Sequence, residues 1–195
     1  MAEVELPNPE ELEEHQAHAF TRHVALTTAI FAVFLAIASL GGGVCMKEML
    51  LAQQQASDQW AFYQAKVIRE HFYLGQKERL ELDLLEKDSL KPEVKQRYQE
   101  LLRQATKKAQ DYSVEKAGIR KQAEHLEHER DKYRGKDPYF EYAEVLLQIA
   151  IVMSSIAILA HSRLMFGFSL ISATLGTLLG ANGFLMIVHL PFFGH

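Results

Sequence analysis

The sequence predicts an all-α membrane protein, with three transmembrane helices and a long antiparallel, coiled-coil-like helical hairpin outside the membrane. Long apolar segments lie near both ends of the 195-residue chain, and the charged residues concentrate between Lys47 and Glu141. Apolar residues in this middle region recur every seven positions, which is typical of paired helices. Its only two prolines, Pro92 and Pro138, stand where helices would begin.

Three segments are long and apolar enough to cross a hydrocarbon core, which requires roughly 20 residues. Residues 24–46 contain no charged residue, and neither do residues 164–188. Residues 142–160 contain one charge, Glu144, near their start. Only residues 161–163 separate the last two segments, so we expect a tight helical hairpin across the membrane.

The other segments are an acidic, histidine-containing tail (residues 1–23), the extramembrane hairpin (residues 47–141) and a short C-terminal tail (residues 189–195). The N-terminal tail carries six glutamates against one arginine. A cleavable signal peptide begins with basic residues, so this start does not fit one. Three crossings place the two chain ends on opposite sides of the membrane.

The charge distribution argues against a nucleic-acid partner. The middle region contains 19 lysines and arginines against 18 aspartates and glutamates, so it presents no basic excess. The single cysteine, Cys45, rules out an intrachain disulfide. Its place in an apolar segment favours a small buried side chain over a reactive thiol.

The middle region reads as two helices of similar length, Lys47–Asp88 and Glu93–Tyr133, joined by a short turn. Each has roughly 40 residues and would rise about 60 Å. The predicted contact positions of the first helix are Ala56, Trp60, Tyr63, Val67 and Leu74. Those of the second are Tyr98, Leu102, Ala105, Ala109, Tyr112, Ile119, Ala123, Leu126 and Tyr133. We interpret the charged residues as a solvated face with pairs at four-residue spacing.

An aromatic cluster, Trp60, Phe62 and Tyr63, is the main candidate interaction site. Trp60 lies 14 residues past Met46, or about 21 Å along a straight helix, which is beyond the headgroups. We therefore favour packing against the returning helix near Ile119–Leu126, or against another subunit. A membrane-interface belt and a ligand site are the two alternatives.

No motif predicts catalysis or a cofactor, so we expect a protein that is not an enzyme. The sequence contains no phosphate-binding glycine loop, no nucleophile triad order and no zinc-protease signature. Histidines at helical spacing occur in "EEHQAHAFTRH" and "AEHLEHE". They fit solvated or pH-sensitive groups better than a metal site, because the paired motifs of a di-metal bundle are missing. We expect no metal ligands.

Small residues recur every four positions in the apolar segments, and such faces let helices approach closely in lipid. The rows are Ser172, Gly176 and Gly180; Ser169, Ala173, Thr177 and Ala181; and Thr28, Ala32 and Ala36. Gly176 and Gly180 join the aromatic cluster as candidate interaction residues. We expect these rows to meet helices, at least one of them from a second copy of the chain.

The chain resembles a bacterial family, the domain of unknown function 4337, over nearly its whole length. The resemblance rests on "VALTTAIFAVFLAIASL", on "LLAQQQASDQWAFYQAK" and on "LLQIAIVMSSIAIL". It implies a small membrane protein without a known catalytic residue. Family members often have a more basic turn between the last two spans, which implies a cytoplasmic turn; here the turn keeps Arg163 and His161.

These observations predict a non-enzymatic, multi-pass protein of the bacterial inner membrane. We expect membrane lipid and further copies of the chain as its partners, with room for an unidentified membrane protein, in a homo-oligomeric scaffold or accessory subunit. The alternatives are a pore or transporter element formed by an oligomer, and a membrane-anchored metal-binding protein. The resemblance favours a cytoplasmic N-terminus and a periplasmic hairpin.

Overall fold

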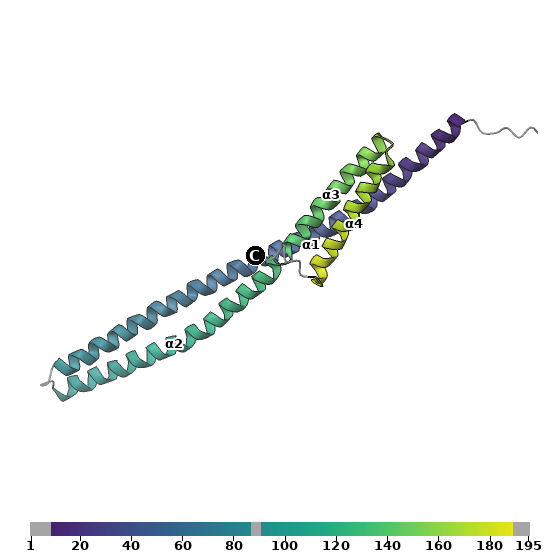
Figure 1. The fold of residues 1–195 in the computed structure, drawn as a ribbon. Coiled ribbons are helices and arrows are strands. Elements are labelled where there is room, and N and C mark those ends of the chain that lie inside the picture. The colour runs from purple at the N-terminus through teal and green to yellow at the C-terminus, as the bar shows by residue number, and fades with distance from the viewer. Residues whose placement is uncertain (1–8, 87–90, 189–195) are drawn as a thin grey trace, which may run out of the picture. The chain divides into compact units, whose positions relative to one another are not determined.

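The fold is given by a computed structural model, which describes residues 9–86 and 91–188. The first part of the acidic tail, the turn expected around residue 88 and the C-terminal tail lie outside these ranges. The described chain is all helical, with no strand, as expected (Figure 1). The helices are α1 (Pro9–Glu86), α2 (Pro92–Arg134), α3 (Asp137–Leu159) and α4 (Arg163–Leu185).

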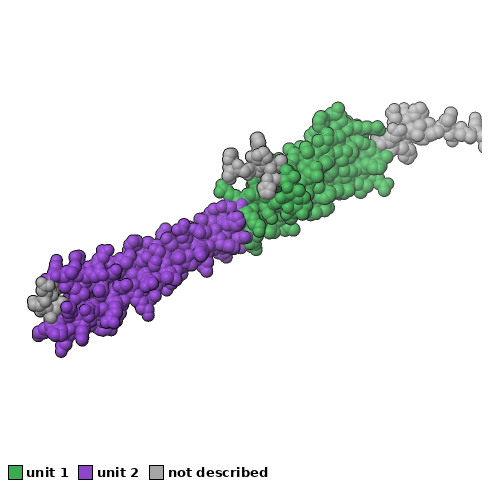
Figure 2. Space-filling view, turned by 60° about the horizontal axis from the view of Figure 1, so that its bottom comes forward, with its two compact units in different colours: residues 1–48, 132–195 green, residues 49–131 purple. Residues whose placement is uncertain are grey.

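The helices form two compact units, which Figure 2 colours separately. Unit 1 comprises Met1–Glu48 and Lys132–His195, and unit 2 comprises Met49–Asp131. Helix α1 contributes to both, because no proline interrupts it between its first residue and Glu86.

Proline and polar caps set the helix boundaries. Pro138 stands in the first turn of α3, where a missing backbone N–H leaves no helical hydrogen bond unmade. The Ser162 hydroxyl accepts from the backbone N–H of Met165 and caps α4. At the other end of α4, Met186 adopts left-handed φ and ψ angles, 50° and 40°. The helix therefore ends at Leu185, three residues before the end of the apolar segment 164–188.

In unit 1, α3 and α4 form a hairpin beside the first half of α1 (Figure 1). The core cluster consists of Phe31 and Ala38 from α1, Ala143, Leu147 and Ala150 from α3, and Ala173 from α4. Most of these residues are small, so the three helices approach closely. Two serine hydroxyls, Ser154 and Ser169, are fully buried and lie 2.9 Å apart, which links α3 to α4.

In unit 2, the second half of α1 and most of α2 lie side by side and run in opposite directions (Figure 1). The predicted contact positions of α2 are all buried or half-buried. Ala105, Ala109, Ile119 and Ala123 are the most buried of them. The seven-residue period therefore marks the face of α2 that contacts α1.

Three helical runs of the described chain are long and apolar enough to span a membrane, judged by length and composition. They lie within His18–Glu86, Pro92–Leu159 and Arg163–Leu185. In their most apolar windows, only 22%, 28% and 22% of the residues are buried inside the chain. Most of this apolar surface is thus free to contact lipid or another protein.

Candidate functional site

The buried face between α1 and α2 follows alternating steps of three and four residues, and we call it the seam. Its α1 positions are Ala52, Ala56, Gln59, Tyr63, Lys66, Glu70, Tyr73, Lys77, Leu80 and Leu84, all buried or half-buried. Such spacing keeps one side of a helix against its partner. Three of these positions, Lys66, Glu70 and Lys77, carry charge, which the sequence did not lead us to expect.

Two ion pairs cross the seam near its middle. Lys66 Nζ lies 2.5 Å from Glu115 Oε2, and Lys116 Nζ pairs with Glu70 Oε2. The Glu70 side chain is only 10% exposed and that of Lys66 only 13%. A charge at this depth is tolerated because an opposite charge accompanies it. The pairs also favour one register, since sliding either helix would leave buried charges unpaired.

Aromatic rings surround the same layer. Lys66 Nζ lies 5.0 Å from the ring centre of Phe62 and 5.2 Å from that of Tyr112. Tyr112 in turn stacks on Tyr73, with ring centres 5.8 Å apart. An ammonium near aromatic faces is attracted by their negative quadrupoles, so the rings stabilise the buried lysine.

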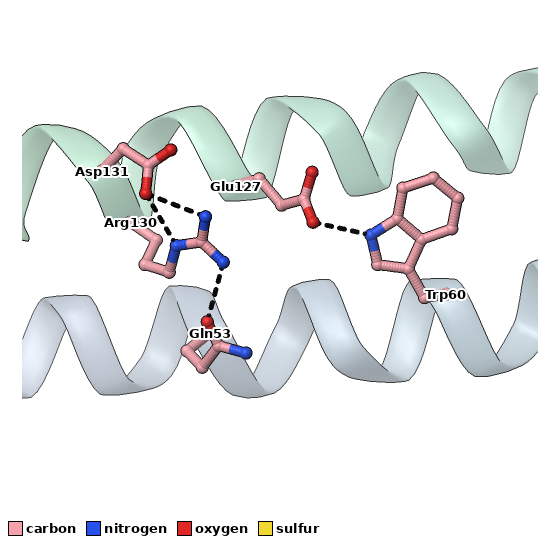
Figure 3. Close-up of polar contacts among 5 residues, drawn as sticks. All are labelled: Gln53, Trp60, Glu127, Arg130 and Asp131. Atoms are coloured by element: carbon pink, nitrogen blue, oxygen red, sulfur yellow. Dashed lines mark hydrogen bonds and ion pairs between the residues drawn. The ribbon is translucent and has the colours of Figure 1, made fainter.

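The aromatic cluster named from the sequence divides between the seam and the surface. The indole N–H of Trp60 donates to Glu127 Oε1 on α2 at 3.0 Å (Figure 3). This contact lies one residue beyond the stretch of α2 expected from helix lengths. Tyr63 is half-buried and packs edge to face on Trp60, with ring centres 5.5 Å apart. Phe62 is 51% exposed, with its ring 5.0 Å from Lys66 Nζ, so about half of this side chain stays open to solvent or a partner.

A second polar contact crosses the hairpin at Gln53, seven residues or about two turns before Trp60. Arg130 donates to Gln53 Oε1 on α1 at 2.9 Å and to its neighbour Asp131 at 2.9 Å (Figure 3). Gln53 is the first of the three glutamines that precede the aromatic cluster in the sequence. Polar bonds therefore tie α1 to α2 at both of these levels.

In unit 1, the row containing Gly176 and Gly180 packs inside the chain. A β-carbon added to Gly176 would lie 3.0 Å from the carbonyl oxygen of Ala143 on α3. One added to Gly180 would lie 3.5 Å from the β-carbon of Ala143 and 3.8 Å from that of Ala38. Ser172, the third member of the row, donates to the carbonyl oxygen of Leu146 at 2.7 Å. Contacts within one chain thus account for this row.

Two further glycines, Gly41 and Gly183, make room for the buried ring of Phe140, which no sequence pattern had indicated. Phe140 on α3 is 1% exposed and packs edge to face on Phe184, with ring centres 4.8 Å apart. A β-carbon on Gly41 of α1 would come within 2.5 Å of this ring, and one on Gly183 of α4 within 3.0 Å. Glycine at both positions therefore lets all three helices close around Phe140.

The uncovered side of α1 in unit 1 carries a row of large apolar residues, which includes Leu26, Val33 and Leu40, and beside it a row of small residues, which we call the small face. This small face consists of Ala25, Ala29, Ala32, Ala36, Ser39 and Gly43, at alternating steps of four and three, and every member is exposed. It includes Ala32 and Ala36 of the predicted row, whereas Thr28 is half-buried. The row predicted from four-residue spacing therefore overlaps only part of the small face, which repeats every seven residues.

No cluster of three or more histidine, cysteine, aspartate or glutamate side chains suited to a metal ion occurs among the described residues. The one cysteine, Cys45, is buried. Burial raises the pKa of Asp137, which precedes the apolar segment of α3. In unit 2, a cleft of about 590 Å³ between α1 and α2 is lined by both signs of charge, including Arg79, Lys107 and Asp111.

Comparison with known proteins gave one match. A family model described as "Domain of unknown function (DUF4337)" matches residues 20–186. The searches of curated proteins and of solved structures found no match. The matched residues include all of α2, α3 and α4 and most of α1, together with the seam and the small face. The chain therefore belongs to the family of the domain of unknown function 4337.

Proposed function

We propose that this protein is a non-enzymatic membrane protein that spans the bilayer three times and self-associates as a scaffold or accessory subunit. The single observation that carries the proposal is the small face of α1. Its six members are exposed, although the other side of the same helix segment is closely packed. Small side chains gain little against lipid tails, but they let a second helix backbone approach.

The other small-residue row supports this assignment by elimination. Gly176 and Gly180 pack against helices of their own chain, so their sequence pattern requires no partner. By contrast, all six members of the small face are exposed, so packing within the chain does not explain their small size. Its steps of four and three residues suit a partner helix that crosses at a shallow angle, as in left-handed membrane pairs.

The test is the mass of the full-length protein in a mild detergent, measured by native mass spectrometry. We expect an oligomer for the wild type and a shift toward monomer for Ala36→Leu, because leucine holds the helices apart. Loss of such a contact is worth on the order of 1–2 kcal/mol per interface. Thr174→Leu is the matched control, since Thr174 is exposed on α4. A monomeric wild type would reject the proposal.

An image of the purified particle separates the scaffold from a pore. Several polar groups of the apolar helices, Ser154, Ser169, Ser172 and Asn182 among them, are hydrogen-bonded within the chain, which supports packing over a conducting path. We expect a particle without a water-filled central channel. A continuous aqueous channel on the symmetry axis would instead favour a pore or transporter element.

For orientation, we propose a cytoplasmic N-terminus and turn at residues 161–163, with the hairpin in the periplasm of a bacterial inner membrane. Regions longer than about 60 residues cross largely regardless of charge, so the basic residues of the hairpin do not decide its side. In a cysteine-free background, a membrane-impermeant thiol reagent should label Glu86→Cys in intact cells and spare Ser162→Cys. The reverse labelling would overturn this orientation.

A further inference from the structure

In unit 2, α1 carries a second regular stripe, on the side away from the seam. The outer stripe consists of Ala61, Ala65, Ile68, Phe72, Gly75 and Leu82, and every member is exposed. Its spacing alternates between four and three residues, except that Arg79 occupies one position of the pattern. The stripe extends over about 30 Å of helix.

The outer stripe is more apolar than the seam at the same level of α1. The seam includes Lys66, Glu70 and Lys77, whereas the outer stripe has Arg79 as its single charged position. Its large side chains are also well exposed: Ile68 is 69%, Phe72 60% and Leu82 59% accessible. Scattered apolar residues are common on protein surfaces, but a continuous row on one helix is typical of a contact surface.

We propose that the outer stripe is the surface through which the hairpins of two copies of this chain pair, with their α1 helices parallel. The inference rests on the proposed function, because membrane insertion gives every copy the same direction and holds its α1 residues at the same height. Identical stripes then meet in register, at the high effective concentration of a shared membrane. An antiparallel pairing is excluded for the same reason.

Charge supports a second copy as the occupant. The region between Lys47 and Glu141 carries 19 basic and 18 acidic residues, so two hairpins meet without net repulsion. A strongly acidic or basic partner would find no complementary field on this region. The outer stripe would instead suit a partner that carries an apolar row of the same length. The α1 helix of a second copy carries such a row.

The experiment is disulfide cross-linking of the full-length protein in native membranes, in a Cys45→Ala background. Parallel pairing in register brings the two Ile68 positions together, so Ile68→Cys should form a dimer on mild oxidation. Val114→Cys is the control, because Val114 is 70% exposed on the other helix of the hairpin. We expect about tenfold less dimer from the control, and a similar loss when Phe72→Glu is added to Ile68→Cys.

The outcomes separate this inference from the proposed function. Equal yields from Ile68→Cys and Val114→Cys, with an oligomeric wild type, overturn the pairing of hairpins and leave self-association through the small face intact. Cross-linking of Ile68→Cys to a different protein also overturns it. A monomeric wild type overturns both proposals together. Selective dimer formation that Phe72→Glu abolishes supports the pairing.

Discussion

The ion pair between Glu70 and Lys116 gives a sharp test of the seam. Glu70→Leu removes the carboxylate and leaves the Lys116 ammonium in the contact between α1 and α2. Removing one partner of a fully buried pair costs about 3–5 kcal/mol, and removing one partner of an exposed pair costs up to about 1 kcal/mol. The side chain of Glu70 is 10% exposed and that of Lys116 27%. We therefore expect about 2 kcal/mol of destabilisation, between the two limits.

The double variant, Glu70→Leu with Lys116→Leu, provides the matched comparison. Replacing a whole buried pair by apolar side chains is often neutral or stabilising, so we expect the double variant to unfold within about 1 kcal/mol of the wild type. The two substitutions are thus expected to be strongly non-additive, because the residues form one unit.

The fluorescence of a single tryptophan provides the assay for these variants. Trp60 is the only tryptophan, and its indole bonds across the hairpin, so its fluorescence reports the separation of α1 from α2. In urea titrations of the full-length protein in detergent, 2 kcal/mol corresponds to about 1 M in midpoint if the slope is about 2 kcal/mol/M. Equal destabilisation by the single and the double variant would refute the reasoning, because it would mean that Lys116 does not depend on Glu70.

The remaining predictions concern other contacts. Gly176→Leu should destabilise unit 1 by on the order of 1–2 kcal/mol in thermal unfolding, whereas Gly167→Leu, which points into open space, should not; equal effects would contradict the packing of this row. Glu127→Gln should keep the Trp60 bond but weaken it, and Glu127→Ala should shift the fluorescence maximum to longer wavelength; an unchanged spectrum in Glu127→Ala would place the indole elsewhere. Burial raises the pKa of Asp137, so its protonated form is favoured in the folded state, and its contribution to stability is lost as pH rises through that pKa. The unfolding temperature of the wild type should therefore fall more between pH 4 and pH 7 than that of Asp137→Asn, and parallel curves would show that this carboxyl does not contribute.

Much of the fold follows from periodicity and composition. The apolar segments have few charges to interrupt them, and Pro92 and Pro138 mark helix starts that match those of α2 and α3. The contact positions of α2 could be read from the sequence because its polar residues leave one apolar row. Family membership is confirmed by the match over residues 20–186.

The five contact positions expected on α1 (Ala56, Trp60, Tyr63, Val67 and Leu74) are all buried or half-buried, but the charged positions of the seam were not predicted. Glu70 and Lys66 were assigned to a solvated face, since charged residues rarely occupy buried positions without partners. Their partners, Lys116 and Glu115, are 46 and 49 residues away in the sequence, and helical periodicity contains no information about such pairs.

The roles of the glycines could likewise be predicted only in part from the sequence. A small residue every four positions predicts close helix packing, and Gly176 and Gly180 do pack closely. Which helix they contact depends on how α1, α3 and α4 associate, and here α1 and α3 of the same chain provide the contacts. The aromatic ring of Phe140 gave no periodic signal, because its neighbours Gly41 and Gly183 belong to two different helices.

The central claim is that copies of the chain associate through the small face of α1. The most direct measurement is the native mass of the wild type beside Ala32→Leu and Ala36→Leu, with Thr174→Leu as the control of equal bulk on α4. The account predicts an oligomer that both α1 variants dissociate and that the control leaves intact. A monomeric wild type, or an oligomer that keeps its mass in both α1 variants, would contradict it.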